Sequence, residues 1–160
     1  MLPCYARLGE TVEQSIQRYG QPTSNGDQAQ DCKILIFKRA PFEIIANFYQ
    51  DKCVALTFYK RQANSDGTLG EENQPLSDEE IKGLMEQNSD GKTWGQPTTS
   101  EASDCVIWVR PDGVVVTYDK NNYWLMFRRN DSAFSAYSTA IKEADKKQKR
   151  DEVKKETNGL

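Results

Sequence analysis

Histidine is absent from this 160-residue chain. The absence excludes histidine-based triads, Cys-His nucleophile activation and histidine-rich metal sites. No glycine-rich phosphate-binding loop is present either. Carboxylate chemistry remains open in principle, and acidic residues are densest between Glu71 and Glu80. Three of them fall in the first turn of a predicted helix, where the dipole favours negative charge, and calcium-loop spacing is missing. We therefore predict no catalytic residues, no metal site, no cofactor and no enzyme.

Long apolar runs are also missing. The mean hydropathy is -0.78, and no segment approaches the roughly 20 apolar residues that span a bilayer. The opening "MLPCYARLGE" has neither the basic region nor the apolar region of a signal peptide. Proline before Cys4 departs from the small residue of a lipoprotein signal. We expect no membrane span and no leader within this sequence, and whether Cys4 is lipidated stays open.

Cysteine is sparse and widely spaced. The four positions are Cys4, Cys32, Cys53 and Cys105, with no Cys-x-x-Cys pair, which disfavours a zinc ribbon or a redox dithiol. An even count suits an oxidising compartment, but the sequence does not choose among the three possible pairings. The alternative is that most of them are free and buried. For Cys4, we expect a role in pinning the N-terminal arm to the body.

Excess positive charge is confined to one end of the chain. Residues 142–155 hold seven basic and four acidic residues, a charge of +3, and the whole chain carries -3, which leaves -6 elsewhere. An acidic body argues against nucleic-acid binding. The mixed-sign tail is typical of a solvated helix rather than a binding arm.

The sequence Gly-Gln-Pro-Thr occurs twice, at 20–23 and 95–98. Before the first copy, Thr11 and Gln14 have the spacing of a capping box, and Val12, Ile16 and Tyr19 share one helix face. Gly20 then ends the predicted helix in the left-handed conformation. Gly95 is expected to have positive φ as well.

Before the second copy, a similar start signal appears. Ser77 and Glu80 have capping-box spacing, and Leu76 and Ile81 occupy the positions of a hydrophobic staple. This predicted helix ends near 88–91.

Each copy continues into three runs rich in β-branched and aromatic residues. In the first they lie at 32–39, 43–49 and 53–60; in the second, "RPDG" and "DKNN" separate them. We predict an α+β fold of two repeats, each a helix plus a three-stranded antiparallel meander, followed by a C-terminal helix. The expected organisation follows the chain in this order: 1–10 arm, 11–61 repeat 1, 62–75 linker, 76–130 repeat 2, and 131–160 helix and charged tail.

The C-terminal helix is predicted to dock only by its first part. Phe134, Tyr137 and Ile141 share one face over about 133–144, after which the apolar face disappears except for Val153. The exposed remainder is expected to be held by i,i+4 ion pairs. These pairs are Glu143–Lys147, Asp145–Lys149 and Asp151–Lys155.

The stretch "LGETVEQSIQRYGQP" resembles the signature of SmpA/OmlA-type outer-membrane-assembly lipoproteins, carried here by Gly9, Thr11, Tyr19, Gly20 and Pro22. In the second copy only Gly95 and Pro97 match well. A tandem pair of such units is similar in outline to the beta-lactamase-inhibitory-protein family, which is secreted and binds an enzyme with a concave sheet. The chain also resembles uncharacterised bacterial secreted proteins that begin "ARxGET", here 6–11. The resemblance implies a periplasmic or secreted protein, although the cysteines do not match the inhibitor family's disulfides.

Aromatic residues on the predicted strands suggest a function. They belong either to a core between the repeats or to a binding face, and we expect Tyr49, Tyr59, Tyr118 and Trp124 to contact a partner because they are amphipathic and lie near turns. The sequence thus predicts an exported, non-enzymatic, protein-binding chain. The alternative is a small-ligand-binding protein or carboxylate-dependent hydrolase with a pocket between the repeats. The oligomeric state and the partner stay open.

Overall fold

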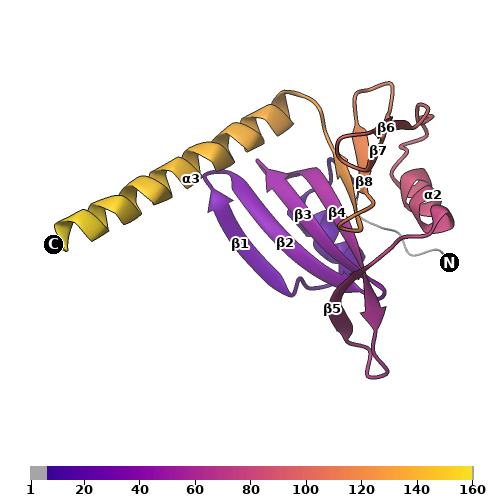
Figure 1. The fold of residues 1–160 in the computed structure, drawn as a ribbon, viewed down its shortest axis with the longest axis horizontal. Coiled ribbons are helices and arrows are strands. Elements are labelled where there is room, and N and C mark those ends of the chain that lie inside the picture. The colour runs from indigo at the N-terminus through magenta and orange to yellow at the C-terminus, as the bar shows by residue number, and fades with distance from the viewer. Residues whose placement is uncertain (1–6, 160) are drawn as a thin grey trace.

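The computed structural model describes residues 7–159, and within them the chain forms three helices and one nine-stranded sheet (Figure 1). The helices are α1 (Val12–Tyr19), α2 (Asp78–Gln87) and α3 (Ser132–Asn158). The strands are β1 (Ser24–Ala29), β2 (Cys32–Arg39), β3 (Phe42–Tyr49), β4 (Lys52–Ala63), β5 (Leu69–Gln74), β6 (Thr98–Ser100), β7 (Cys105–Val109), β8 (Val115–Asp119) and β9 (Trp124–Arg128). The predicted α+β class is confirmed. No helix of residues 7–159 has the length and apolar character to cross a bilayer.

The sheet is antiparallel at every pairing and runs β1-β2-β3-β4-β9-β8-β7-β6. The two halves of the chain therefore meet where β4 pairs with β9. Strand β4 is long enough to pair twice: Ala55–Tyr59 face β9, and its later residues from Lys60 to Ala63 pair with β5. This arrangement makes one continuous surface from two stretches far apart in the sequence.

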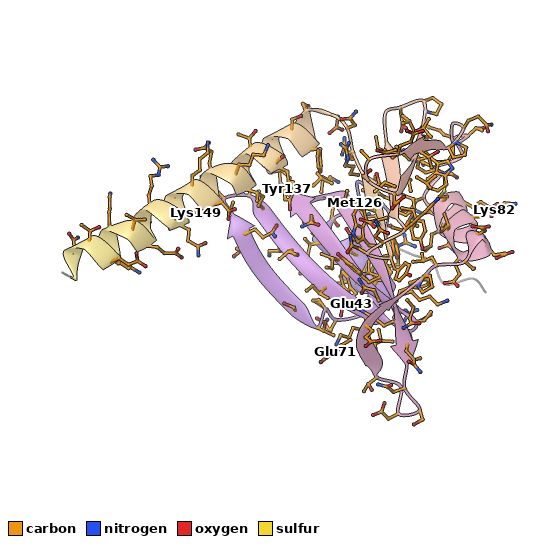
Figure 2. The ribbon with its side chains drawn as sticks, viewed as in Figure 1. Glu43, Glu71, Lys82, Met126, Tyr137 and Lys149 are labelled. Carbon is orange, nitrogen blue, oxygen red and sulfur yellow. The ribbon has the colours of Figure 1, made fainter. Side chains whose placement is uncertain are left out.

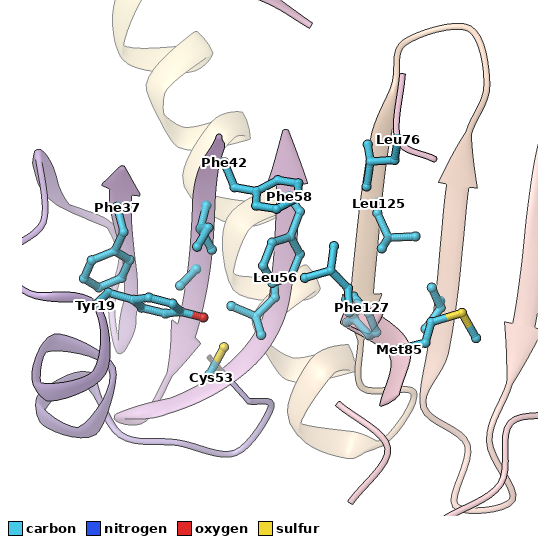
Figure 3. Packing of buried hydrophobic residues seen from close by; sticks show 14 of the residues in the cluster. Tyr19, Phe37, Phe42, Cys53, Leu56, Phe58, Leu76, Met85, Leu125 and Phe127 are labelled. Carbon is cyan, nitrogen blue, oxygen red and sulfur yellow. The ribbon is translucent and has the colours of Figure 1, made fainter. Parts of the chain in front are cut away.

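The core lies on the side of the sheet that carries α1 and α2. Figure 3 shows Phe42, Phe58 and Phe127 side by side across the junction of the halves. Phe58 is fully buried and makes edge contacts with both neighbouring rings, at centroid distances of 6.2 and 5.8 Å. Truncating such a residue to alanine costs about 3–5 kcal/mol. The core is therefore shared by both halves rather than divided between them.

Helix α1 begins and ends as the sequence predicts. Thr11 and Gln14 form a reciprocal capping box, and Gly20, with φ of 86°, donates its N–H to the Ile16 carbonyl. Tyr19 is buried and its ring lies 4.9 Å from that of Phe37. The helix thereby covers the first half of the sheet.

Helix α2 keeps only half of its predicted capping box. Ser77 accepts a hydrogen bond from the Glu80 N–H, but the Glu80 carboxylate instead accepts one from Lys60 Nζ at 2.6 Å. This ion pair joins α2 to β4. Leu76 and Ile81, the expected staple, are both buried in the core.

The expected positive φ at Gly95 is wrong; Gly91 takes that conformation instead. Gly95 donates its N–H to the Val109 carbonyl at 2.9 Å, and a β-carbon at Gly95 would lie 2.7 Å from that oxygen. Close backbone approach, rather than a left-handed turn, thus explains the glycine.

The two-repeat, three-stranded description is not confirmed. Strands β1 and β6 precede the three expected runs, and β5 follows the first set, so five strands follow α1 and four follow α2. The expected linker, 62–75, contains the end of β4 and all of β5. Arg61 orders it by donating to the Glu71 carbonyl and the Asn73 side chain. The domain boundaries stay a prediction.

Candidate functional site: an open face of the sheet

The sheet has two unlike faces. One carries α1, α2 and the core, and the other carries α3 alone (Figure 1). Residues that pair across antiparallel strands point to the same side, so the register assigns each side chain to a face. On the α3 side, five cross-strand pairings link six partly exposed residues into one line across six strands. We call it the central row: Ile36, Ile45, Thr57, Met126, Thr117 and Ile107.

The central row combines apolar and small polar side chains. Four of its members are Ile or Met, and two are Thr. Met126, labelled in Figure 2, lies on β9 opposite Thr57 of β4, where the two halves join. An aliphatic line of this length on a solvent-facing sheet is unusual, because an open face is normally polar.

An aromatic pair flanks the central row. Tyr59 and Trp124 are directly opposite each other on β4 and β9, and both are partly exposed. The Arg61 guanidinium lies 5.3 Å from the centre of the Tyr59 ring and pairs with Glu43 at 3.1 Å. These contacts fix the tyrosine ring and place a charged pair at the margin of the apolar surface.

Helix α3 packs on the same face of the sheet, on the side of the central row away from the aromatic pair. The Tyr137 hydroxyl donates to Gln28 Oε1 at 3.0 Å and accepts from Asn47 Nδ2 at 2.8 Å. Burial raises the pKa of Tyr137, because the phenolate would lose its hydration. Arg128 lies over the Phe134 ring at 5.2 Å. Since Arg128 and Trp124 are four residues apart, the aromatic pair lies about 13 Å along the strand from this cover.

The four predicted contact residues do not form one surface. Tyr59 and Trp124 are together, and Tyr49 is on the same face but beyond Asn47, where α3 packs. Tyr118 lies apart from them: it is 8% exposed, belongs to the core, and its hydroxyl accepts a hydrogen bond from the Leu76 N–H. Its parity on β8 matches that of Val116, which places it on the helix-covered face.

The sequence reasoning missed the aliphatic part of this surface. Met126 shares parity with Trp124 in "WLMFR", and Ile107 and Thr117 occupy matching positions on the neighbouring strands. Alternation along each strand was a usable signal for Met126. The register that joins β4 to β9 was not readable, because it links residues about 70 positions apart.

A separate groove of about 700 Å³ lies beside α2. Its floor includes Trp94, Val106 and Trp108, and the Trp94 Nε1–H donates to the Met85 carbonyl at 2.9 Å. Two exposed acidic residues, Asp78 and Glu86, also line it. The groove therefore sits within the second half of the chain, not between the halves where a pocket was expected.

The ion pairs near this groove are structural. Arg110 is 7% exposed, forms a two-point contact with Asp112 at 2.7 and 2.6 Å, and donates to the Asn88 carbonyl at 2.7 Å. The Arg110 guanidinium holds the pKa of the Asp112 carboxyl well below its ordinary value. It also lies 5.4 Å from the Trp94 ring centre. Arg110 thus anchors the end of α2 and the wall of the groove.

The cysteines offer no disulfide among the residues that the structure describes. Cys32, Cys53 and Cys105 are free and buried. Burial strongly raises the pKa of the Cys53 thiol, which makes it a poor nucleophile. Cys4, and the role expected for it, lie outside the described residues. Within residues 7–159, no group of three or more Cys, Asp or Glu side chains is placed to hold a metal ion.

Comparison with known proteins identifies no family for this chain. No protein-family model matches it, and no curated protein matches it. Two solved structures are similar in part. An extracellular protein containing an SCP domain, from Bacillus anthracis, has a TM-score of 0.46 and 9% identity, over 77% of this chain and 44% of that one. A cysteine-rich secretory protein from Staphylococcus aureus has a TM-score of 0.40 and 8% identity, over 77% and 43%.

These comparisons correct the family expected from the sequence. The similar structures are SCP-type proteins, so the resemblance to SmpA/OmlA-type and beta-lactamase-inhibitory-protein families is wrong. The Gly-x-Pro motif that carried it is a general helix-stop signal, which explains the error. This chain spans less than half the length of either similar structure. At these TM-scores the likeness carries no argument about function.

Proposed function

We propose that this chain is an exported, non-enzymatic protein that binds another protein through the central row and the Tyr59–Trp124 pair. The observation that carries the proposal is the in-register line of partly exposed aliphatic side chains beside two partly exposed aromatic rings. Interfaces are enriched in aromatic residues, methionine and arginine, all of which this face presents. The partner surface that fits is apolar at its centre and polar at its rim.

The charges around this face support a defined orientation of the partner. Arg61 and Glu43 lie beside Tyr59, and the exposed Lys38 pairs in register with Glu43 on the same face. Charges at a rim contribute more to orientation and association rate than to affinity. The aliphatic row and the aromatic pair are therefore expected to supply most of the binding free energy.

The experiment is site-specific photocrosslinking followed by affinity measurement. A photoreactive amino acid replaces Thr57, in the middle of the row, and as a control replaces the exposed Thr139 on the outside of α3. The expected result is a crosslinked protein from position 57 and none from position 139. The captured protein, once purified, must bind Thr57→Arg at least tenfold more weakly than the wild type; equal affinity contradicts the proposal.

The groove beside α2 favours a second candidate function, the binding of a small apolar molecule. Its volume of about 700 Å³ and its two tryptophans are typical of ligand sites. The test is quenching of tryptophan fluorescence by a panel of apolar compounds, with Trp108→Phe as the matched variant. Quenching that is unchanged when both Trp94 and Trp108 are replaced by Phe, or no quenching by any compound, contradicts this candidate.

A further inference from the structure

The second half of α3 extends away from the sheet. Figure 1 shows the helix continuing beyond the β1 edge, and every residue from 145 to 158 is exposed. In the first half, by contrast, Phe134, Tyr137 and Ile141 pack against the sheet. The extension therefore needs a reason other than core formation.

Charges on this helix are sorted by side. With about 100° between successive residues, six basic side chains fall within an arc of about 160°. These are Lys142, Lys146, Lys147, Lys149, Arg150 and Lys154, and one acidic residue, Glu143, lies within the same arc. The remaining arc carries four acidic side chains and one lysine: Asp145, Asp151, Glu152, Glu156 and Lys155. The sequence count alone, a mixed-sign run, does not show this separation.

The basic side faces away from the body. Tyr137, Ile141 and Ala144 point toward the sheet, and the same helical projection puts the centre of the basic arc about 180° from them. Among residues 7–159, one ion pair involves this arc and joins Lys146 to Glu143 at 3.3 Å. The other five basic side chains have no ion-pair partner there, so their charge is directed outward.

The three i,i+4 pairs expected from the sequence are replaced by other contacts. Glu143 pairs with Lys146 rather than Lys147, and Gln148 donates to Glu152 at 3.0 Å. Arg150 Nε donates to the Lys146 carbonyl at 3.2 Å. Exposed contacts of this kind are weak, so the outward-facing basic side chains stay available to bind a partner.

We propose that the outer basic side of α3, defined by Lys142, Lys146, Lys147, Lys149, Arg150 and Lys154, binds an anionic lipid surface. The basic side chains follow one straight helix for about 18 Å, which suits a flat target. A partner helix would need apolar residues at helical spacing, and the exposed part offers Val153. Nucleic acid carries charge of the same sign, so duplex DNA is included in the test below as a competing target.

The magnitudes favour a lipid surface over an acidic protein. A single exposed ion pair between proteins contributes little, whereas each basic residue near an anionic bilayer strengthens binding roughly fivefold at low salt. Six such residues on one side act together. Because the basic side is opposite the packed side, the sheet would lie on the far side of the helix from the lipid.

The experiment is co-sedimentation of the full chain with lipid vesicles. The vesicles are equal parts of phosphatidylcholine and phosphatidylglycerol, with pure phosphatidylcholine as the uncharged comparison. The test variant combines Lys146→Gln, Arg150→Gln and Lys154→Gln, which preserve helix propensity. The matched control makes the same change in charge on the body with Lys52→Gln, Lys82→Gln and Lys120→Gln, all exposed.

We expect the wild type to bind the anionic vesicles. At about fivefold per charge, the helix variant should bind about a hundredfold more weakly than the wild type. The body variant should bind within about threefold of the wild type. Binding should vanish near 1 M salt, where the Debye length is about 3 Å. Circular dichroism checks that the variant keeps its helix. Three results would overturn the proposal. They are no sedimentation with anionic vesicles, an equal loss of vesicle binding in both variants, and tighter binding to a duplex DNA than to the vesicles.

Discussion

Tyr59 and Trp124 lie directly opposite each other on β4 and β9, at the seam where the two halves of the chain join into one sheet. The pair exists only because this seam forms, since 64 residues separate the two positions. The core covers one face of these two strands, and the face that carries Tyr59 and Trp124 is open. The binding surface and the fold therefore depend on the same strand pairing.

Substitution of two glycines in the second half tests the close-approach explanation for Gly95, with Gly83 as the unconstrained comparison. Gly95→Ala should destabilise the protein by more than about 1 kcal/mol, because its β-carbon would meet the Val109 carbonyl at 2.7 Å. Gly83→Ala, inside α2 with open space around it, should stabilise by about 0.5–1 kcal/mol. Urea denaturation measures both. A Gly95→Ala protein as stable as wild type would refute the close-approach explanation.

The Arg110–Asp112 contact should make stability depend on pH. The folded-state pKa of Asp112 lies below its ordinary value of 3.8, so its contribution is complete above that pH and is lost as pH falls below it. At neutral pH, Asp112→Asn should cost about 1–3 kcal/mol, because Arg110 is buried. The difference from wild type should shrink between about pH 5 and pH 2.

The control for this prediction is Asp90→Asn. Asp90 pairs with Lys92, but it is 74% exposed and solvent screens the pair, so its loss should leave the denaturation midpoint close to that of the wild type. Denaturation midpoints across the pH range measure both variants. A cost for Asp112→Asn that is the same at every pH would show that the carboxylate charge is not responsible.

The described cysteines should behave as buried free thiols. Cys32 and Cys53 are 1% and 0% exposed, and burial raises the pKa of both thiols. We expect neither to react with a thiol reagent in the native protein, and both to react in denaturant without prior reduction. Peptide mapping after labelling identifies each position. A disulfide that includes Cys32 or Cys53 would contradict this arrangement.

Hydrogen exchange should divide α3 near Ala144. Amides in the docked part are stabilised by packing against the sheet, while the exposed residues 145–158 rely on local helix stability alone. Protection in the docked part should exceed that in the exposed part by at least about tenfold. Mass spectrometry of peptides from each part measures this. Equal protection along the whole helix would mean that the exposed part has packing contacts of its own.

Local features of this fold were predictable from the sequence, and long-range ones were not. The caps at Thr11 and Ser77, the stop at Gly20 and the apolar strand runs depend on near neighbours, and each was found. Strands β1, β5 and β6 were missed because they are polar and are ordered by pairing with neighbouring strands. Gly95 was misjudged because Val109, which explains it, lies at the end of β7, 14 residues further along the chain.

The candidate site shows the same limit. Tyr59 and Trp124 were identified as amphipathic residues near turns, and both lie on the open face. Tyr118 has the same local character, but strand parity buries it in the core. Helix α3, whose docking point depends on Tyr137 reaching Asn47, separates Tyr49 from the others. The alternation of residues along each strand predicted which side chains share a face. The sequence did not predict which face the helices would cover.

The most direct test of the proposed function is the affinity of the photocaptured partner for a protein altered at two positions of the central row. Thr57→Arg and Thr117→Arg place charge on the open face, on strands either side of Met126. Ser135→Arg with Thr139→Arg, both exposed on α3, make the same change elsewhere. We predict that calorimetry shows at least a hundredfold weaker binding for the row variant and less than a twofold change for the helix variant. Equal affinities for the row variant and the wild type, with both folded, would contradict binding through this face.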